Sequence, residues 1–371
     1  MHIDRLEVFT YPIPFKTVFR HSSASRRRAE NLIVAAHADN GLIGYGEGCP
    51  RDYVTGETID SGAAFIREHA NNISLEVTDT QTLFAWTNAH RELIDRNPAA
   101  FCAVELAILD LFGKIESVPV EDLLDVPRLS GIFTYSAVLG DAPRLAYRWQ
   151  LRRYRNQGFS DYKVKLSGNQ QRDSRKMEDL IRKSETPLRI RLDANNHWNN
   201  VDECIHHITV LPGKFFAIEE PVQAGDLNGF SKVGNACGVR IILDESFTRI
   251  EQMDSLQDDG LWLLNVRVSK MGGLHRSQEI VKEALARGIG IIVGAQVGET
   301  SILTRAGLTV MNTARPLLEA SEGAFGTYLL RQDLTTKCLR FGYKGEYPVN
   351  NINSEPGLGL NVRGRSLLPA P

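Results

Sequence analysis

The sequence contains few cysteines, and their spacing excludes two classes of site. Its 371 residues include five cysteines, and no two of them form a CxxC pair. An odd number of scattered cysteines fits neither a disulfide framework nor a cysteine-based zinc site. We therefore expect reduced structural thiols at Cys49, Cys102, Cys204, Cys237 and Cys338.

Long apolar runs and a strong charge imbalance are also missing. No apolar segment approaches the ~20 residues that a membrane-spanning helix requires. The first residues, "MHIDRLEVFTYPIPF", carry early charges and resemble a strand rather than a signal peptide. The formal net charge is −2, which gives no reason to expect nucleic acid or an anionic membrane as a partner. We expect a soluble, cytoplasmic protein that acts on a small molecule.

The first ~125 residues have the pattern of an α+β unit. In "ENLIVAAHADNGLIGYGEG", Asn40-Gly41 is a strong hairpin signal between two strands. The glycines of this hairpin do not indicate a dinucleotide site, because no helix follows them directly. Three helical stretches come next, and the last begins at Asn97-Pro98 as a cap followed by proline and ends near Gly113.

From about Tyr135 the pattern changes to short β-branched runs that alternate with amphipathic helical segments. Eight such runs indicate a parallel sheet closed as a (β/α) barrel. After about Gly326 this rhythm stops. The runs are "FTYSAVL", "YKVKL", "LRIRLDAN", "FFAIEEP", "VRIILDES", "LWLLNVRVSK", "GIGIIVGAQVGE" and "RPLLEASEG".

Charged residues follow the ends of five consecutive predicted barrel strands. Active sites of such barrels lie at the carboxyl ends of the strands, so we expect these side chains to meet at one rim. In chain order they are Lys163 and Lys165, Asp193, Glu219 and Glu220, Asp244, and Lys270.

Each of these residues alone has an ordinary structural explanation, since an aspartate after a strand is often a helix cap and a lysine there is usually solvated. Their order, one per strand–helix unit, favours a site. Three carboxylates on adjacent strands repel one another unless a cation lies between them. A set of oxygen ligands with room for water and substrate suits Mg²⁺, and lysines on both sides then meet opposite faces of a bound substrate.

The motifs "KVK", "DAN", "EEP", "DES" and "KMGG", in this order, resemble those of the enolase superfamily, within it the muconate-lactonizing-enzyme subgroup that includes dipeptide epimerases. The helix "FCAVELAILDLFGK" resembles the last helix of that family's capping domain. The resemblance implies an α/β fold: a (β/α)7β TIM-like barrel over residues 126–325, an α+β capping domain over 1–125, and a C-terminal segment, 326–371, that returns to and completes the capping domain.

The resemblance also implies roles for the rim residues. Asp193, Glu219 and Asp244 match the Mg²⁺ ligands, and Lys165 and Lys270 match acid/base groups on the two sides of the substrate. The remaining matched positions are Lys163 as an auxiliary charge and Asn195, Glu220 and Glu245 as neighbours of the ligands. A free lysine has a pKa near ~10.4. We expect Lys163, the metal and partial burial to lower the pKa of Lys165 toward working pH.

The resemblance leaves more than one reaction open. Mg-dependent removal of the proton α to a carboxylate, through a metal-stabilised enolate, is common to all of them. Two opposed lysines favour racemisation or epimerisation of a dipeptide or N-substituted amino acid. A cycloisomerase, a dehydratase and a non-catalytic barrel are the alternatives. The mandelate-racemase branch is set aside, because "GAQVGET" after the seventh strand offers no histidine base.

Substrate contacts are expected from the capping domain and the last two barrel strands. Arg26, Arg27 and Arg28 lie where the family has a mobile loop, and arginine binds carboxylates bidentately; the alternative is a solvated run that leads into a strand. Dipeptide epimerases typically show D-x-D at strand eight, where this chain has Glu319-Ala320-Ser321-Glu322. The candidate substrate-binding residues are Arg26, Arg28, Tyr53, Glu299, Glu319 and Glu322. The resemblance also implies a homo-oligomer, a dimer or an octamer.

Overall fold

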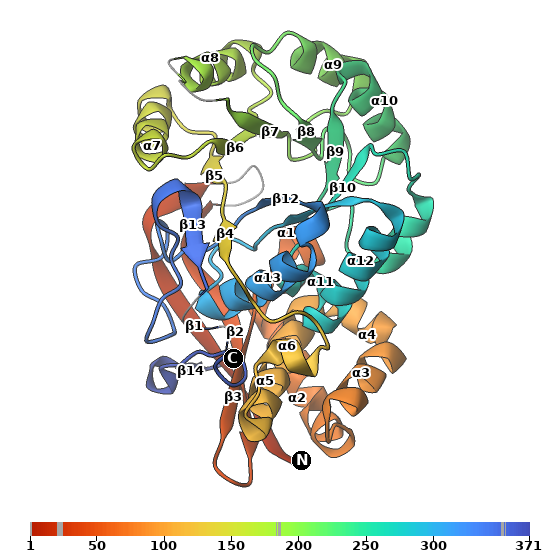
Figure 1. Cartoon of the computed structure of the whole chain (residues 1–371), viewed down its shortest axis with the longest axis vertical. Coiled ribbons are helices and arrows are strands. Elements are labelled where there is room, and N and C mark those ends of the chain that lie inside the picture. The colour runs from red at the N-terminus through yellow and green to blue at the C-terminus, as the bar shows by residue number, and fades with distance from the viewer. Residues whose placement is uncertain (1, 21–24, 183, 185–186, 350–351, 353) are drawn as a thin grey trace.

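The computed structural model describes residues 2–20, 25–182, 184, 187–349, 352 and 354–371 (Figure 1). The N-terminal part forms an antiparallel sheet to which the end of the chain adds one short strand, so the sheet order is β14-β1-β2-β3. The predicted hairpin is confirmed, since β2 and β3 pair antiparallel around a turn with Gly41 at φ 84°. The strands are β1 (Ile3–Arg20), β2 (Ser25–Ala38), β3 (Ile43–Gly48) and β14 (Leu368–Pro369).

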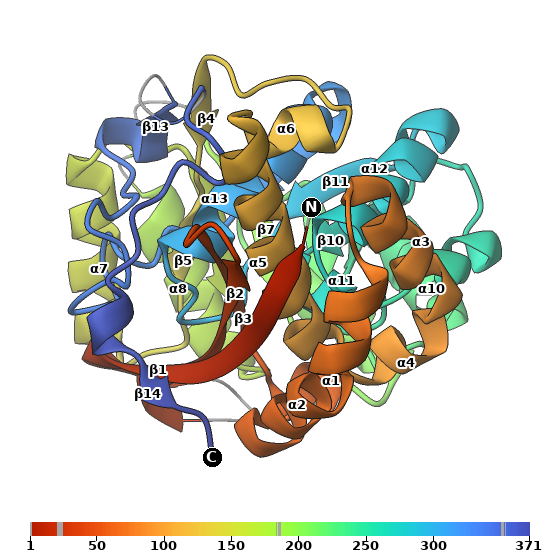
Figure 2. The same cartoon turned by 90° about the horizontal axis from the view of Figure 1, so that it is seen from below.

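Six helices follow this sheet, and α5 lies directly along it (Figure 2). A Cβ atom at Gly44, Gly46 or Gly48 of β3 would lie 1.9–2.1 Å from a backbone oxygen of α5. These alternating glycines therefore allow close helix–strand packing, which explains the glycine pattern of the hairpin. The helices are α1 (Asp52–Thr55), α2 (Ile59–Glu76), α3 (Thr80–Ala89), α4 (Arg91–Arg96), α5 (Pro98–Glu116) and α6 (Val120–Leu123).

The start of α5 differs from the sequence-based expectation. Pro98 is at the first helical position as predicted, but the Asn97 side chain makes no cap hydrogen bond. The buried Glu57 carboxylate caps the helix instead, because it accepts from the backbone N of Ala99 at 2.9 Å and of Ala100 at 3.0 Å. The helix also continues past Gly113 to Glu116.

The largest sheet of the fold is an eight-stranded parallel one in the order β12-β11-β10-β9-β8-β7-β6-β5, and β13 and β4 form a small antiparallel pair. All eight predicted runs form its strands. Between its first and last strands, the Ser136 backbone N donates to Ser321 O at 2.8 Å. The strands are β5 (Ala137–Leu139), β6 (Asp161–Lys165), β7 (Arg189–Asp193), β8 (Ala217–Glu219), β9 (Arg240–Leu243), β10 (Trp262–Val266), β11 (Gly290–Val293) and β12 (Leu318–Ser321).

Seven crossovers join these strands, and the one between β9 and β10 is a 3₁₀ helix rather than an α-helix. The crossover elements are α7 (Arg144–Asn156), α8 (Gln170–Ile181), α9 (Val201–Thr209), α10 (Leu227–Cys237), η1 (Ile250–Ser255), α11 (Val268–Met271) with α12 (Leu274–Arg287), and α13 (Ser301–Thr313). The remaining elements are β4 (Ile132–Thr134), η2 (Arg315–Leu317), η3 (Tyr343–Gly345), β13 (Glu346–Pro348) and η4 (Gly364–Ser366).

Buried glutamates of the N-terminal part hold the amino ends of two barrel helices. Glu47 of β3 accepts from Thr300 N at 2.9 Å and from Leu303 N at 3.1 Å, at the start of α13. Glu105 of α5 accepts from the backbone N of Leu274, at the start of α12. Carboxyl oxygens cap these helix ends because the first N–H groups of a helix lack partners there.

The C-terminal segment lies against the N-terminal sheet. The Arg331 backbone N donates to Pro14 O at 3.0 Å, and the Lys16 N donates to Leu329 O at 2.8 Å. Within the described part of the chain, no helix is long and apolar enough to cross a membrane. All five cysteines lie in the described part of the chain, and none forms a disulfide there.

Candidate active site

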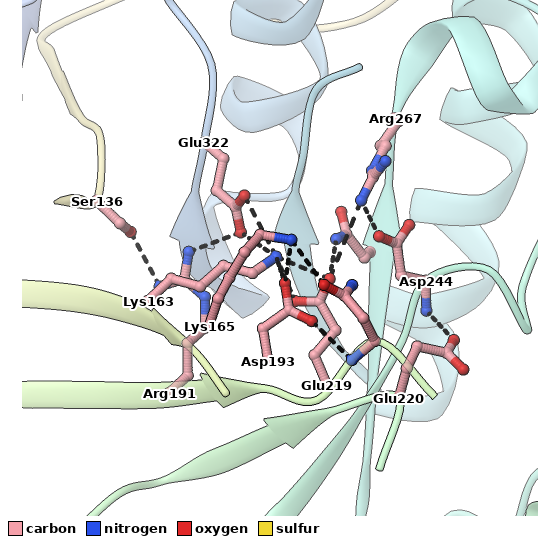
Figure 3. A network of polar contacts seen from close by, with 12 residues as sticks. Ser136, Lys163, Lys165, Arg191, Asp193, Glu219, Glu220, Asp244, Arg267 and Glu322 are labelled. Atoms are coloured by element: carbon pink, nitrogen blue, oxygen red, sulfur yellow. Dashed lines mark hydrogen bonds and ion pairs between the residues drawn. The ribbon is translucent and has the colours of Figure 1, made fainter. Parts of the chain in front are cut away.

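Three buried carboxylates lie side by side at the carboxyl ends of three consecutive strands (Figure 3). Asp193 is the last residue of β7, Glu219 is the last residue of β8, and Asp244 directly follows β9. The ladder aligns Asp193 with Glu219 and Lys165 with Asp193. The structure therefore brings these predicted rim residues together.

Lys163 and Lys165 point to the same face of β6, as their spacing predicts. Each Nζ lies 3.1 Å from Asp193 Oδ2. The Lys163 Nζ also donates to Glu219 Oε1 at 2.8 Å, and Lys165 Nζ donates to Asn195 Oδ1 at 2.8 Å. Burial opposes the charge of Lys163, but Asp193, Glu219 and Glu322 outweigh it and raise the pKa of Lys163 above its usual value. Burial likewise opposes ionisation of Asp193, and the two lysines hold its pKa well below the usual range.

Lys270 lies at the other end of the carboxylate row and is fully buried. It sits on the helical turn α11 rather than at the end of a strand, because β10 already ends at Val266. Its Nζ donates to Asp244 O at 2.6 Å, to Asp244 Oδ1 at 2.9 Å and to Asn265 O at 2.9 Å. Burial, followed by the charge of Arg267, lowers the pKa of Lys270 to about 7.

The glycines of the "KMGG" motif have a structural reason. Gly272 and Gly273 have φ angles of 84° and 116°, which favour glycine. A Cβ atom at Gly273 would lie 2.1 Å from a carboxylate oxygen of Glu105. Glycine there lets the capping-domain carboxylate reach the start of α12, directly after the turn that carries Lys270.

Behind Lys163, a charged network fills part of the barrel interior (Figure 3). Arg191 is fully buried and donates to Glu322 Oε1 at 2.9 Å, to Asp161 Oδ1 at 2.8 Å and to Ser136 Oγ at 3.1 Å. Glu322 also lies 3.2 Å from Lys163 Nζ. Burial opposes ionisation of Glu322, but Lys163 and Arg191 lower the pKa of Glu322 to about 2. Glu322 is therefore an ionised member of the network.

Arg191 and Arg267 belong to the site although the sequence motifs did not single them out. Arg267 follows β10; it donates to Asp244 Oδ2 and, at 3.0 Å, to Gln296 Oε1. For Arg191 a signal existed, because its spacing of two from Asp193 on a strand places both side chains on one face. Arg267 had no such signal, since its position depends on where β10 ends.

Two of the three predicted neighbours, Asn195 and Glu220, hydrogen-bond to the ends of the strands that carry the carboxylates. Asn195 donates its backbone N to Asp193 Oδ1 at 3.1 Å. Glu220 accepts from Asp244 N at 2.7 Å and from Ser246 N at 2.8 Å, and its φ of 45° marks a sharp turn at the end of β8. Burial first, then the charge of Glu220, raise the pKa of Glu245 to about 7.

The donor set fits a hard divalent cation. Asp193 Oδ2 and Glu219 Oε2 are buried oxygens without a hydrogen-bond partner in the described part of the chain, and ion pairs with lysine are their counter-charges. Carboxylate oxygens of this kind suit Mg²⁺. As the side chains stand, no three acidic, histidine or cysteine groups of the described residues converge closely enough to hold a metal, because cations of the chain contact the same oxygens. The residues therefore fit the ion in type, and their side chains must rearrange to bind it.

The predicted substrate-binding residues divide into two groups. Glu322 lies in the network, and Glu299 is buried in the loop after β11, where it accepts from Gln296 N at 2.6 Å. Burial raises the pKa of Glu299 to about 8. Tyr53 is half-buried on α1. Their roles stay predictions.

Of the three other predicted contacts, two lie away from this cluster. Glu319 pairs with Arg189 and Arg240, the first residues of β7 and β9, and so lies at the amino-terminal end of the barrel, opposite the carboxylate row. Glu319 was predicted at the substrate site, and this prediction is wrong, because the residue lies at the opposite end of the barrel. Arg28 is exposed, pairs with Glu30 at 2.5 Å and lines a surface pocket with Thr10 and Ile59. The side chain of Arg26 is outside the described part of the structure.

The barrel, its capping sheet and the rim of carboxylates and lysines define a class, the enolase-like barrel proteins. Two family models match the chain. Residues 5–125 match the mandelate racemase/muconate lactonizing enzyme N-terminal domain, and residues 146–366 match the enolase C-terminal domain-like family. The chain belongs to the mandelate racemase/muconate lactonizing enzyme family of the enolase superfamily, and the predicted resemblance is confirmed.

Similar proteins of known activity are isomerases. The chain is 27% identical to the L-Ala-D/L-Glu epimerase of Bacillus subtilis, over 99% of this chain and 98% of that protein. It is 24% identical to the N-succinyl-L-Arg/Lys racemase of Bacillus cereus, over 99% of this chain and 97% of that protein. These relatives confirm the predicted class, an isomerase of the enolase superfamily.

Solved structures share the fold at lower identity. The dipeptide epimerase of Enterococcus faecalis, in complex with Mg and L-Leu-L-Tyr, superposes with a TM-score of 0.85 at 23% identity, covering 97% of this chain and all of that one. A muconate lactonizing enzyme gives 0.84 at 22% identity, covering 98% of both chains. Both confirm the predicted α/β barrel with its separate antiparallel N-terminal sheet.

Proposed function

We propose that the protein is a Mg²⁺-dependent racemase or epimerase that exchanges the proton α to a carboxylate in a dipeptide or an N-substituted amino acid. One observation carries the proposal. The carboxylates of Asp193, Glu219 and Asp244 form a row on β7, β8 and β9, and a lysine contacts each end of the row, Lys165 from β6 and Lys270 from the turn after β10.

The chain's own residues have distinct tasks in this proposal. Lys165 and Lys270 move protons at the α-carbon, one removing a proton and the other delivering one from the opposite side, which inverts the configuration. Lys163, held by Glu219 and Asp193, supplies fixed positive charge beside the substrate carboxylate. Asp193, Glu219 and Asp244 would hold Mg²⁺. The bound ion supplies Lewis-acid stabilisation of the negative charge that develops on the substrate carboxylate.

The relatives support the choice of reaction. The similar proteins named above include an epimerase of L-Ala-D/L-Glu and a racemase of N-succinyl-L-Arg/Lys, and two structural neighbours contain Mg and a dipeptide. Neither a dipeptide nor an N-succinyl amino acid is singled out by the contacts of the site. The oligomeric state, a dimer or an octamer, stays a prediction.

The test is α-deuterium uptake in D₂O with Mg²⁺, on separate panels of L,L-dipeptides and N-succinyl-L-amino acids. Mass spectrometry measures deuterium at the α-carbon, and chiral chromatography measures optical purity. We expect uptake together with loss of optical purity in at least one panel. Deuterium uptake without loss of optical purity, or no uptake in either panel, would contradict racemisation. The latter result would favour a cycloisomerase or a dehydratase on the same frame.

A further inference from the structure

Both carboxylate oxygens of Asp244 are already in contact with cations of this chain. Lys270 Nζ donates to Oδ1 at 2.9 Å, and the Arg267 guanidinium donates to Oδ2. Asp244 itself is fully buried. A divalent cation that binds through Asp244 therefore competes with these two partners for the charge of the carboxylate.

The two partners differ in how easily they can leave. Lys270 is fully buried, and two backbone carbonyls, those of Asp244 and Asn265, accept from its Nζ as well. Moving this ammonium would break both of these buried hydrogen bonds, which is costly, although Asp244 O would keep a second donor in the Phe247 backbone N. The side chain of Arg267 is 12% exposed, so its guanidinium can regain contact with water. Arg267 is thus the partner that a cation can displace more easily from Asp244.

Arg267 has a second acceptor in reach. Its guanidinium donates to Gln296 Oε1 at 3.0 Å from the loop after β11, on the side away from β9. Its Nε and the Gln296 Nε2 have no hydrogen-bond partner among the described residues. When Asp244 is lost as an acceptor, the contact with Gln296 remains, and the guanidinium stays partly satisfied.

The charge of Arg267 also reaches a second carboxylate of the row. One guanidinium nitrogen lies 4.0 Å from Glu219 Oε1, and Figure 3 shows the side chain extending toward both Glu219 and Asp244. A cation in this place weakens the mutual repulsion of the carboxylates, and a metal ion would do the same. The two cations compete for the same negative charge.

We propose that Arg267 is an internal counter-ion of the metal site, which a divalent cation displaces from Asp244, and that Gln296 retains the displaced guanidinium. Arg267 is a positioning residue in this sense, and it sets the metal affinity without contacting the substrate. The inference rests on the assignment of Asp193, Glu219 and Asp244 as metal ligands.

Isothermal titration calorimetry with Mg²⁺ tests the displacement directly, without any substrate. Arg267→Gln removes the competitor, so we expect the dissociation constant for Mg²⁺ to fall about fivefold or more, within the usual range for coupled binding events. The control is Arg128→Gln, which makes the same charge change in an exposed ion pair with Asp122, and its affinity should equal that of the wild type. Unchanged binding by Arg267→Gln would mean that Arg267 does not compete with the metal. Weaker binding would mean that Arg267 holds Asp244 in place for the metal. Either result would overturn the proposal.

Gln296→Ala gives a second, independent test in a variant that keeps all charges. After displacement from Asp244, the guanidinium depends on Gln296 more than before. Loss of this acceptor should therefore make displacement harder and raise the dissociation constant for Mg²⁺. In the double variant with Arg267→Gln, the Gln296→Ala change should have no further effect, because no guanidinium remains to be retained. Equal effects of Gln296→Ala in both backgrounds would contradict the coupling. If Arg267→Gln does not fold, the single variant Gln296→Ala still tests the proposal.

Two further titrations separate this inference from the proposed function. If the wild type binds Mg²⁺ and Asp193→Asn binds it more weakly, the metal assignment stands. The Arg267→Gln titration then tests only the displacement of Arg267. If the wild type binds no Mg²⁺, the metal assignment and the inference both fail. Thermal melting of each variant in a chelating buffer confirms that folded proteins are compared.

Discussion

The ammonium group of Lys163 lies 2.7 Å from Glu219 Oε2, a carboxylate two strands away in the barrel. Asp193 and Glu322 lie 3.1 and 3.2 Å from the same nitrogen. Lys163 is therefore surrounded by acids, and much of its charge is offset within the chain. In this arrangement it links the carboxylates of Asp193, Glu219 and Glu322.

Metal binding is the first consequence that can be measured. Asp193→Asn and Asp244→Asn each replace a carboxylate oxygen of the row by an amide, so we expect Mg²⁺ to bind about tenfold more weakly or worse. Calorimetric titration measures the affinity. Asp202→Asn, in the first turn of α9 and exposed, is the matched control and should bind like the wild type. Unchanged affinity in both ligand variants would place the metal elsewhere.

The buried arginine behind the site should contribute strongly to stability. Arg191→Met leaves the ionised Glu322 with one cation fewer in the interior, and we expect a loss of about 3 kcal/mol in the free energy of unfolding. Arg189→Met is the comparison, because Arg189 also pairs with Asp161 but is 37% exposed; its loss should be about 1 kcal/mol. Urea denaturation measures both values. A loss for Arg191→Met no larger than that for Arg189→Met would contradict the network's importance.

Glu105 should make stability depend on pH. Burial raises the pKa of Glu105 to about 8, well above its value in the unfolded chain. The folded protein therefore binds a proton that the unfolded chain has released, and stability is lost as pH rises from about 4.5 toward 8. Glu105→Gln cannot ionise, so its stability should fall less between pH 5.5 and 8.5.

The measurement is the difference in unfolding free energy between wild type and Glu105→Gln at the two pH values. We expect this difference to change by about 2 kcal/mol or more, since each pKa unit corresponds to about 1.4 kcal/mol. Comparing the variant with the wild type cancels the contributions of other buried carboxyls such as Glu47. Parallel pH profiles would mean that Glu105 ionises equally in the folded and unfolded chains.

The sequence predicted the residues whose position depends only on strand register. Lys163, Lys165, Asp193 and Glu219 end or nearly end their strands, and parallel strands bring such residues to one edge. Lys270 lies on the predicted edge of the barrel. The sequence pattern placed it at the end of a strand, whereas the structure places it on the helical turn α11. The alternation in "NVRVSK" resembles a strand, whereas the chain becomes helical at Val268.

Residues further from the strand ends were harder to predict. Glu319 and Glu322 are close in sequence, but three residues of a strand span about 10 Å, so one lies at each end of the short barrel strand β12. Arg28 was expected at the substrate, but its side chain lies on the same face of β2 as Glu30, with which it forms an ion pair. Its neighbour Ala29 is on the other face, against the loop after β11, where a Cβ atom at Gly298 would lie 2.5 Å from the Ala29 Cβ. The capping domain's position over the barrel fixes this orientation, and no local pattern contains it.

The two-lysine assignment is tested most directly by proton exchange at each face of the substrate. Lys165→Ala and Lys270→Ala are incubated with Mg²⁺ in D₂O, each with the two separate stereoisomers of a substrate found with the wild type. We expect neither variant to invert configuration, and each to exchange the α-proton of one stereoisomer only, a different one for each variant. Lys282→Ala, an exposed change on α12, should behave like the wild type. Inversion that survives in either lysine variant, or exchange of the same stereoisomer by both, would contradict a mechanism with Lys165 and Lys270 on opposite sides of the substrate.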